Sequence, residues 1–376
     1  MEVGPILGIL SIPRSSTNPF LVGQNESFAE IVTIAKRMNC TAFVFSAADI
    51  DWAKRAVWGY KCNVNSDSYE WERHLYPLPS IIYNRIPNRT LEKREEVRKA
   101  IELLQQKYGP RLFNPCFLDK WQTHTILCNN KQTVDFLPTT QRLSRYKVIT
   151  DMLEQYKSVF LKPTADSLGN EIIKIDKDSQ KCYHFIHQTL SNQRREGFAS
   201  SFRELLKELP SITDGANNTY LVQQAIALAK FKGRPFDLRL LIQKNRHGQW
   251  QKTGVAARVA GEGSITTHVF YGGTRDSTRK AIDYAAKAHR FSRVEVEKQL
   301  KTLISLFPKT IEKSAKQSFG ELEIDLGIDQ QGKVWFFEAN SKPFRFDEKL
   351  IRAKSLVRLI HYAKFLDAQK FNSPAG

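Results

Sequence analysis

Acidic and amide side chains follow a run of aromatic residues near the end of the chain. Glu338 and Asn340 stand two residues apart, just after Trp335, Phe336 and Phe337. Burying three aromatic rings requires neither polar group, and alternation along a strand places Glu338 and Asn340 on one face. These two side chains are either the solvated end of a strand or ligands that hold a bound group.

A turn signal, Asp-Gln-Gln-Gly at residues 329–332, separates this run from an earlier segment in which apolar residues alternate. The combined pattern predicts a β-hairpin. We expect Ile328 to pair with Lys333 across the turn, and this register places Glu323 opposite Glu338.

The predicted register also separates the polar from the apolar side chains. Glu323, Asp325, Glu338 and Asn340 share one face with Phe336, which lies opposite Asp325. The other face is expected to carry the apolar side chains of Leu322, Ile324, Leu326, Ile328, Trp335, Phe337 and Ala339.

Asp325 and Glu338 are diagonal neighbours in this register, about 7 Å apart. Two facing carboxylates repel unless a cation lies between them. Their oxygens suit Mg²⁺, which takes one or two carboxylates and completes its shell with phosphate oxygens and water. The alternative is that the hairpin exposes an ordinary polar side to solvent.

A lysine ends another apolar strand. Lys162 closes the run Val-Phe-Leu-Lys, and a loop of small residues containing Ser167 and Gly169 follows it. A lysine fixed beneath such a loop can clamp a phosphate with a point charge and backbone N–H donors. The chain has no GxxxxGK[ST] pattern, so this is not a P-loop. A lysine solvated at a strand end is the alternative.

Two arginines lie in strand-like segments. Asp237 and Arg239 share one face of the segment 235–244, where they either pair with each other or direct Arg239 at a phosphate or carboxylate. Arg258 stands alone among small residues, which leaves room above it for a ligand.

The composition limits the class of protein. The chain has 376 residues and a formal charge of +18, and this length predicts two or three packed units. The charge indicates either an anionic partner (nucleotide, nucleic acid, acidic peptide or wall polymer) or a solvated basic surface. Lys and Arg occur in several mixed segments and not in one block, which favours phosphate handling over a dedicated nucleic-acid surface.

The cysteines and apolar runs indicate the compartment. The five cysteines form no CxxC pair, which suits a reducing cytosol and argues against a zinc site or disulfide framework. The apolar runs are too short to span a membrane, and the first residues lack a basic leader with a cleavage site. We therefore expect a cytoplasmic protein without a membrane span.

Residues 1–116 alternate between strand and helix patterns, which predicts a small, mostly parallel sheet flanked by helices. The expected strands are 5–10, 41–46 and 79–89, and the expected helices are 27–39 and 90–109. Residues 58–74 are expected to be irregular. Thr90 is the expected cap of the second helix and Gly109 its end.

The remainder of the chain reads as a second mixed region. Helices are expected at 118–130, 145–156, 184–209, 277–316 and 346–368. Extended segments are expected at 158–163, 170–176, 219–228, 235–244, 251–260, 265–273 and, as the hairpin, 321–339. The last helix is amphipathic and is expected to pack on the domain.

Taken in order, these motifs resemble the ATP-grasp superfamily. The series is a lysine strand with a loop, Val-Gln-Gln at 222–224, Phe-Asp-Leu-Arg at 236–239, the Arg258 strand and Glu-Ala-Asn-Ser-Lys-Pro at 338–343. It resembles most the peptide-ligase branch, and the whole chain resembles the YheC/YheD family of endospore coat-associated proteins. The ATP-grasp resemblance covers about residues 117–364.

The resemblance implies a fold and a domain plan. The fold is α/β (α+β): two α+β subdomains enclose the nucleotide, preceded by a small α/β domain. The implied boundaries are residues 1–116, 117–220 and 221–376.

The resemblance also implies roles for the nucleotide-binding residues. Lys120 and Lys162 correspond to the two nucleotide-binding lysines, and the loop with Ser167 and Gly169 would close over the phosphates. The hinge facing the adenine would contain Gln223 and Gln224, with the main chain near Ile226 contacting the base edge, and Asp237 belongs to the matching Asp-Leu-Arg motif.

The same comparison implies catalytic and metal-binding residues. Arg239 would lean toward the γ-phosphate or the acceptor, and Arg258 would stabilise the phosphorylated intermediate. Asp325, Glu338 and Asn340 match the three Mg²⁺ ligands of the family.

The implied activity is ATP- and Mg²⁺-dependent joining of a carboxylate to an amine through an acylphosphate, with peptide or protein substrates and spore-coat partners. The alternatives are a non-catalytic nucleotide-binding protein of the coat and a binder of anionic polymers. The acceptor site stays open because two positions depart from the family. Glu323 stands where the D-alanine ligase branch has an arginine, and His268 and Phe270 replace an Asn-x-His pattern.

Overall fold

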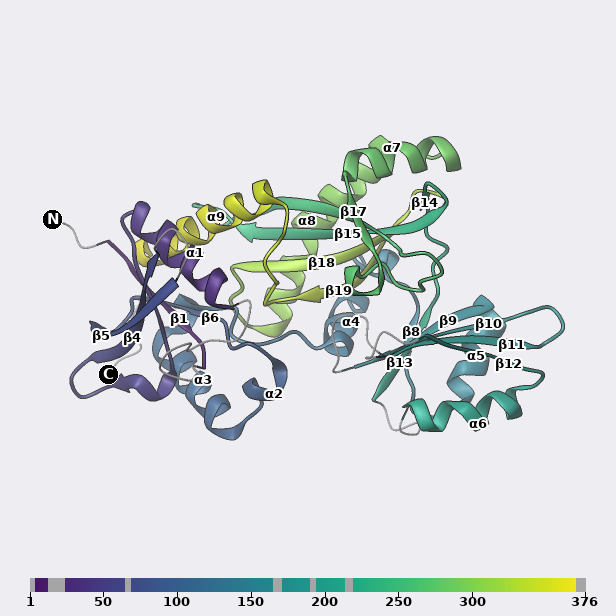
Figure 1. Ribbon diagram of the computed structural model, residues 1–376, viewed down its shortest axis with the longest axis horizontal. Coiled ribbons are helices and arrows are strands. Elements are labelled where there is room, and N and C mark those ends of the chain that lie inside the picture. Colours follow the sequence, from purple (N-terminus) through teal and green to yellow (C-terminus); the bar gives the residue numbers. More distant parts are fainter. Residues whose placement is uncertain are drawn as a thin grey trace.

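The computed structural model describes residues 4–12, 24–64, 69–164, 171–189, 194–213 and 219–369. Within these residues three β-sheets follow one another along the chain, each covered by helices (Figure 1). The first sheet lies at one end of the molecule, the third in the middle and the second at the other end. This mixed architecture confirms the expected α/β class.

The first sheet has the strand order β3-β4-β2-β1-β6-β7, with β5 paired to β4. Its strands are β1 (Ile6–Leu10), β2 (Thr41–Phe45), β3 (Ile50–Asp51), β4 (Ala56–Val64), β5 (Tyr69–Pro77), β6 (Ile81–Asn84) and β7 (Leu112–Phe113). Its helices are α1 (Gln24–Arg37), η1 (Ala47–Asp49), α2 (Arg89–Glu92), α3 (Glu95–Tyr108) and η2 (Gly109–Arg111). The pairs among β2, β1, β6 and β7 are parallel, as predicted.

Two predictions for this region are wrong. Residues 58–74 are not irregular, because most of them belong to the antiparallel pair β4–β5, whose outer strand exposes charged residues and so lacks a clear apolar pattern. Thr90 is not a cap, since the side chain of Asn88, two residues earlier, accepts a hydrogen bond from the Leu91 amide. Gly109 ends α3 with positive φ, as expected.

The second sheet is antiparallel, with the order β12-β11-β10-β9-β13-β8. Its strands are β8 (Thr140–Arg142), β9 (Ser158–Pro163), β10 (Ile172–Lys177), β11 (Tyr183–Gln188), β12 (Arg194–Ala199) and β13 (Tyr220–Gln224). Two helices, α5 (Lys147–Tyr156) and α6 (Phe202–Thr213), contribute to its core. The helix expected at 184–209 is wrong for its first part, because the charged residues there lie on the exposed edge strand β12 and not on a helix face.

The third sheet has the order β17-β16-β15-β18-β19, with β14 paired to β15. Its strands are β14 (Lys230–Phe231), β15 (Arg234–Lys244), β16 (Trp250–Val259), β17 (Thr274–Asp276), β18 (Glu321–Ile328) and β19 (Val334–Asn340). Around it lie α4 (Lys120–Cys128), η3 (Val134–Phe136), η4 (Val269–Tyr271), α7 (Thr278–His289), α8 (Arg293–Ala315) and α9 (Lys349–Ala368).

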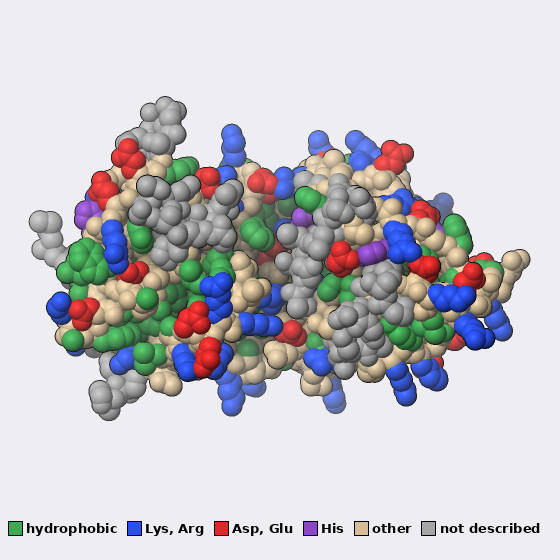
Figure 2. All heavy atoms as spheres, turned by 60° about the horizontal axis from the view of Figure 1, so that its bottom comes forward, with side chains coloured by type: hydrophobic (Ala, Val, Ile, Leu, Met, Phe, Trp, Pro, Cys, Tyr) green, Lys and Arg blue, Asp and Glu red, His purple; other side chains and the backbone are tan. Residues whose placement is uncertain are grey.

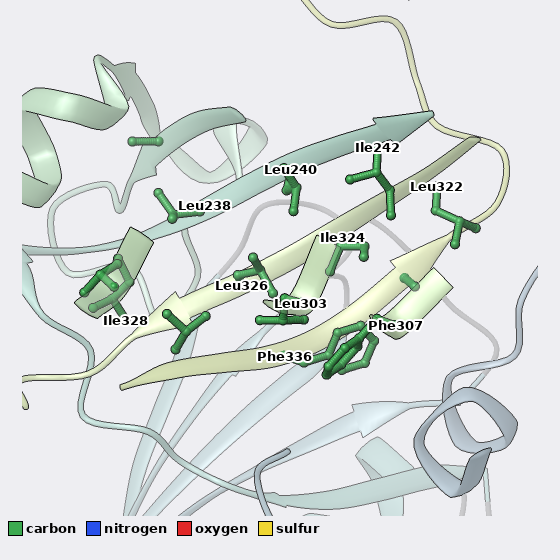
Figure 3. Packing of buried hydrophobic residues seen from close by; sticks show 14 of the residues in the cluster. Leu238, Leu240, Ile242, Leu303, Phe307, Leu322, Ile324, Leu326, Ile328 and Phe336 are labelled. Carbon is green, nitrogen blue, oxygen red and sulfur yellow. The ribbon is translucent and has the colours of Figure 1, made fainter. Parts of the chain in front are cut away.

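The core of the third sheet positions the later site. Leu303 and Phe307 of α8 pack against apolar side chains of β15, β18 and β19 (Figure 3). The rings of Phe307 and Phe336 lie 5.1 Å apart. Because this face of the sheet is apolar, the polar side chains of the same strands point to the opposite face.

The extended segment expected at 265–273 is wrong. Its middle forms the short helix η4, and the amides of Tyr271 and Gly273 both donate to the carbonyl of His268. Gly272, with φ of 77°, permits the turn that these bonds close.

Helix α9 joins the first and third sheets, so its predicted packing on the domain is confirmed. Ile360 and Tyr362 belong to the core of the first sheet, and Gln243 of β15 donates to the carbonyl of Ser355. No helix among the described residues combines the length and apolar character of a membrane span. Figure 2 shows Lys and Arg side chains scattered over one face and mixed with acidic ones.

Candidate active site

The β18–β19 hairpin forms, but its predicted register is wrong. The Asp329 carboxylate accepts hydrogen bonds from the amides of Gln331 and Lys333, which keeps Lys333 in the turn. Ile328 therefore pairs with Val334. A register shift between Asp325 and Leu326 then changes the pairing of the remaining residues.

Because Ile328 pairs with Val334, Trp335 and Phe336 exchange their predicted faces, and the later shift leaves Phe337 as an unpaired residue of a β-bulge. Phe336, expected on the polar face, is buried in the core, whereas Trp335 and Phe337, expected in the core, are only half-buried. Beyond the bulge the alternation resumes, and Ala339 faces the core as predicted.

The turn and the bulge together bring the predicted metal ligands closer than the expected register would. Asp325 lies directly opposite Glu338, not diagonal to it, and Glu323 lies opposite Asn340. Asn340 donates from its amide nitrogen to Glu323 Oε1 at 3.3 Å. Glu323, Asp325, Glu338 and Asn340 therefore share one polar face, as predicted. Their cross-strand partners differ from the expected ones.

Two arginines from neighbouring strands meet Asp325. Arg239 lies across from Asp325 in the β15–β18 pair and donates two hydrogen bonds to its carboxylate, both 3.2 Å long. Nη2 of Arg258 lies 2.9 Å from Asp325 Oδ2. Burial alone would raise the pKa of Asp325, but the two guanidinium groups lower it well below its usual value.

Asp237 pairs across the sheet with Arg258, not along its strand with Arg239. Arg258 Nε donates to Asp237 Oδ1 at 2.8 Å, and the Thr267 hydroxyl donates to Asp237 Oδ2 at 2.6 Å. Asp237 therefore orients Arg258. Thr267 was not singled out from the sequence, because a threonine in a loop gives no periodic signal.

Breaking this buried pair should cost stability. Asp237 and Arg258 are both about 5 % exposed, so Asp237→Asn removes half of the charge compensation of a buried guanidinium. We expect a loss of about 3 kcal/mol in the free energy of unfolding, measured by urea titration. The matched control Asp283→Asn removes a carboxylate 2.9 Å from Arg293 at the surface and should leave stability nearly unchanged. Equal effects of the two changes would contradict this account of Asp237.

Both predicted nucleotide-binding lysines lie at the Glu338 end of the site. Lys120, the first residue of α4, lies 3.2 Å from Glu338 Oε2. Lys162 donates to Gln223 Oε1 at 2.6 Å, and its ammonium lies 5.3 Å from the Phe337 ring. Burial, only partly offset by the attraction of Glu338, lowers the pKa of Lys162 to about 8.

The hinge residues follow β13. Gln223 also donates to the Thr140 hydroxyl at 3.0 Å, so it links Lys162 to β8. The Gln224 amide donates to the Thr139 carbonyl at 2.8 Å, and the Gln224 side chain accepts from the Thr139 amide. Ile226 is half-buried in the segment that leads to the third sheet.

The loop predicted to cover the phosphates contains Ser167 and Gly169, which lie outside the described residues. The strands on either side of that loop, β9 and β10, pair antiparallel from Ser158 with Asp176 to Leu161 with Ile173.

The donor set fits Mg²⁺. Asp325 and Glu338 offer facing carboxylates and Asn340 an amide oxygen, which are the hard ligands that this ion takes. One oxygen of the neighbouring Glu323 carboxylate is buried without a hydrogen-bond partner. The described residues contain no cluster of three or more His, Cys, Asp or Glu side chains suited to a metal.

Comparison with known proteins identifies the family. Residues 109–366 match the family model described as YheC/D like ATP-grasp. The chain belongs to this family. Its fold is therefore the ATP-grasp fold, as expected from the order of its motifs.

Relatives of the YheC/D-like ATP-grasp family extend over much of the chain. It is 30% identical over 382 residues to the endospore coat-associated protein YheD of Bacillus subtilis (strain 168), covering 100% of this chain and 81% of that protein. It is 23% identical over 293 residues to YheC of the same strain, covering 75% of each.

A solved structure shares the fold. The VanG D-Ala:D-Ser ligase of Enterococcus faecalis superposes with a TM-score of 0.52 at 12% identity, covering 97% of this chain and 98% of the ligase. At this identity the likeness concerns the fold alone.

Proposed function

We propose that the chain is an ATP- and Mg²⁺-dependent ligase that joins a carboxylate to an amine through an acylphosphate. The observation that carries this proposal is the convergence of four cationic side chains on one pair of carboxylates. Lys120 and Lys162 approach Glu338, while Arg239 and Arg258 hold Asp325. Positive groups that surround metal-binding oxygens are the arrangement that phosphoryl transfer requires.

The nucleotide is proposed to lie between the second and third sheets. Lys120 and Lys162 bind its phosphates, and the segment of Gln223, Gln224 and Ile226 contacts the adenine. The loop with Ser167 and Gly169 covers the phosphates. This placement uses the proposed division of the chain at residues 116 and 220.

The metal would be held by Asp325, Glu338 and Asn340. When bound, Mg²⁺ would neutralise the negative charge on the phosphate oxygens. Asp237 keeps Arg258 oriented, so that its guanidinium can bind the acylphosphate, and Arg239 can turn from Asp325 toward the γ-phosphate or the acceptor.

The proposed reaction has two steps. A carboxylate oxygen of the substrate attacks the γ-phosphorus, the bond to the bridging oxygen breaks, and ADP leaves. The amine nitrogen then attacks the acyl carbon, loses its excess protons, and expels phosphate with the original carboxylate oxygen. Positioning and charge neutralisation suffice for both steps, so no side-chain nucleophile is needed.

The relatives suggest a location. Both are named endospore coat-associated proteins, and we propose that this chain likewise acts in the cytoplasm on coat peptides or proteins. Incubation of the full chain with Mg-ATP and pools of amino acids and spore peptides tests the activity. ADP, phosphate and a mass-shifted product support the ligase. Nucleotide binding without turnover on any pool favours a non-catalytic coat protein, and no nucleotide binding excludes both.

ATP binding should depend on pH through Lys162. Its ammonium titrates near pH 8, so below that pH the charge that binds phosphate is already present. Above pH 8 the lysine must take up a proton to bind ATP, and affinity should fall up to about tenfold per pH unit.

Calorimetry in two buffers of different ionisation enthalpy measures this proton uptake. We expect uptake at pH 9 in the native protein and none in the Lys162→Arg variant, whose guanidinium stays charged. The same uptake in both proteins would assign the titrating group elsewhere.

A further inference from the structure

A mostly buried carboxylate joins two segments of the chain that lead into the proposed site. Glu92, the last residue of α2, accepts a hydrogen bond from the Phe117 amide at Oε1, over 2.8 Å. Its Oε2 binds the ammonium of Lys342. The side chain of Glu92 is 13% exposed and that of Lys342 is 3% exposed, so water competes little for either contact.

Each of these two segments carries residues of the proposed site. Phe117 precedes Lys120 by three residues, and Lys342 follows Asn340 by two. The segments approach each other again at the site, where Lys120 Nζ lies 3.2 Å from Glu338 Oε2. A shift of either segment would therefore change the spacing between the proposed phosphate-binding lysine and the proposed metal ligands.

Further contacts hold the same two segments together. The Ser341 hydroxyl donates to the Cys116 carbonyl at 2.6 Å, and the Asn114 side chain donates to the Ser341 carbonyl. The Lys342 ammonium also lies 4.5 Å from the centre of the Phe117 ring. To these contacts α2 adds an ionic one, through a single side chain that binds both segments.

Stability alone is a weak reason for a buried ion pair at this place. Removing two charges from water costs free energy that their attraction repays only with good geometry, and apolar side chains of similar volume often stabilise such a position equally well. An apolar pair, however, could not accept the hydrogen bond from the Phe117 amide. The carboxylate of Glu92 provides directed bonds to both segments, and these bonds fix the distance between them.

We propose that Glu92 is a positioning residue, which fixes Lys120 relative to Glu338 and Asn340. The inference rests on the proposed function, ATP and Mg²⁺ binding at this site, and adds to it a residue that lies outside the matched region 109–366. Glu92 acts through its two partners and touches neither nucleotide nor metal. Loss of such an outer partner typically lowers metal affinity or activity by about 10- to 100-fold.

The test compares Mg-ADP affinity, measured by calorimetry, with stability, measured by urea titration. Glu92→Gln should weaken Mg-ADP binding by about tenfold or more and lower the urea midpoint, because Lys342 loses its ionic partner. Adding Lys342→Met removes the unpaired ammonium. The double variant should recover the urea midpoint but not the Mg-ADP affinity, since the directed bonds between the segments are still missing.

Glu312 of α8 offers a matched control. Its Oε1 accepts from the Phe319 amide at 3.0 Å and lies 2.6 Å from the Lys244 ammonium, so this carboxylate also joins an amide and a lysine. Neither partner has a role in the proposed site. Glu312→Gln should lower the urea midpoint and leave the Mg-ADP affinity unchanged.

Hydrogen exchange followed by mass spectrometry tests the positioning without any nucleotide. In Glu92→Gln we expect faster amide exchange in peptides that cover residues 116–121 and 338–345, because each segment loses a contact with α2. In Glu312→Gln these peptides should exchange as in the native protein.

Several outcomes would overturn the inference: unchanged exchange of both segments in Glu92→Gln, an Mg-ADP affinity that recovers together with the urea midpoint in the double variant, or equal losses of affinity in Glu92→Gln and Glu312→Gln. Native Mg-ADP binding with the same affinity in Glu92→Gln contradicts only the role of Glu92. No Mg-ADP binding by the native protein would contradict the proposed function itself.

Discussion

Replacing Lys162 by methionine should weaken ATP binding on the order of 100-fold and leave the protein folded. The ammonium of Lys162 lies between the Phe160 and Phe337 rings, 5.5 and 5.3 Å from their centres, with Gln223 as its hydrogen-bond partner. Holding a charge in this environment already lowers its pKa to about 8. Methionine fills a similar volume and carries no charge that must be buried. The free energy of unfolding should therefore stay the same or rise.

Lys174 provides the matched control for this change. It lies on β10 of the same sheet and pairs with Asp176 at 2.8 Å. Lys174→Met should leave ATP affinity unchanged. ATP titration by calorimetry on both variants is decisive, because similar affinities for Lys162→Met and the native protein would remove Lys162 from the nucleotide site.

Replacing Glu338 by glutamine should lower Mg²⁺-dependent ATP consumption by about 10² to 10³-fold. The side chain packs no core, and its Oε2 contacts Lys120, so the glutamine variant should remain folded. Because the change removes a negative charge beside two lysines, metal-free ATP should bind at least as tightly as before. The Mg²⁺ concentration for half-maximal activity should rise.

The Mg²⁺ titration distinguishes a metal ligand from a mere partner of Lys120. An increased Mg²⁺ requirement with retained ATP binding supports a ligand. A variant that loses ATP binding while its Mg²⁺ requirement stays the same would show that Glu338 only positions Lys120. Glu295→Gln, at the exposed start of α8, serves as a control with no expected effect.

Much of the site could be predicted because its residues are separated by even numbers along strands. Glu338 and Asn340, like Glu323 and Asp325, must share a face in any register, and the pairing of β18 with β19 brings the two sets together. The apolar alternation of β18 likewise predicts its buried face.

The register itself could not be predicted. The bulge at Phe337 and the Asp329 turn each shift the pairing by one residue, and neither has a signal that alternation can reveal. Alternation therefore places Trp335, Phe336 and Phe337 on the wrong faces of β19, although it places Glu338 and Asn340 on the correct one.

The cross-strand ion pairs depended on sheet order. Arg239 meets Asp325, and Arg258 meets Asp237, because β15 lies between β16 and β18. Residues so far apart in sequence become neighbours through tertiary pairing alone.

The most direct test of the proposed function follows one oxygen atom. The full chain is incubated with Mg-ATP, free amino acids and a pool of coat peptides whose carboxylates carry ¹⁸O, and the released phosphate is analysed by mass spectrometry. The proposed acylphosphate transfers one labelled oxygen to phosphate and gives a peptide heavier by one amino-acid residue. Release of unlabelled phosphate, or no ADP with any peptide, would contradict ligation at the Asp325–Glu338 site.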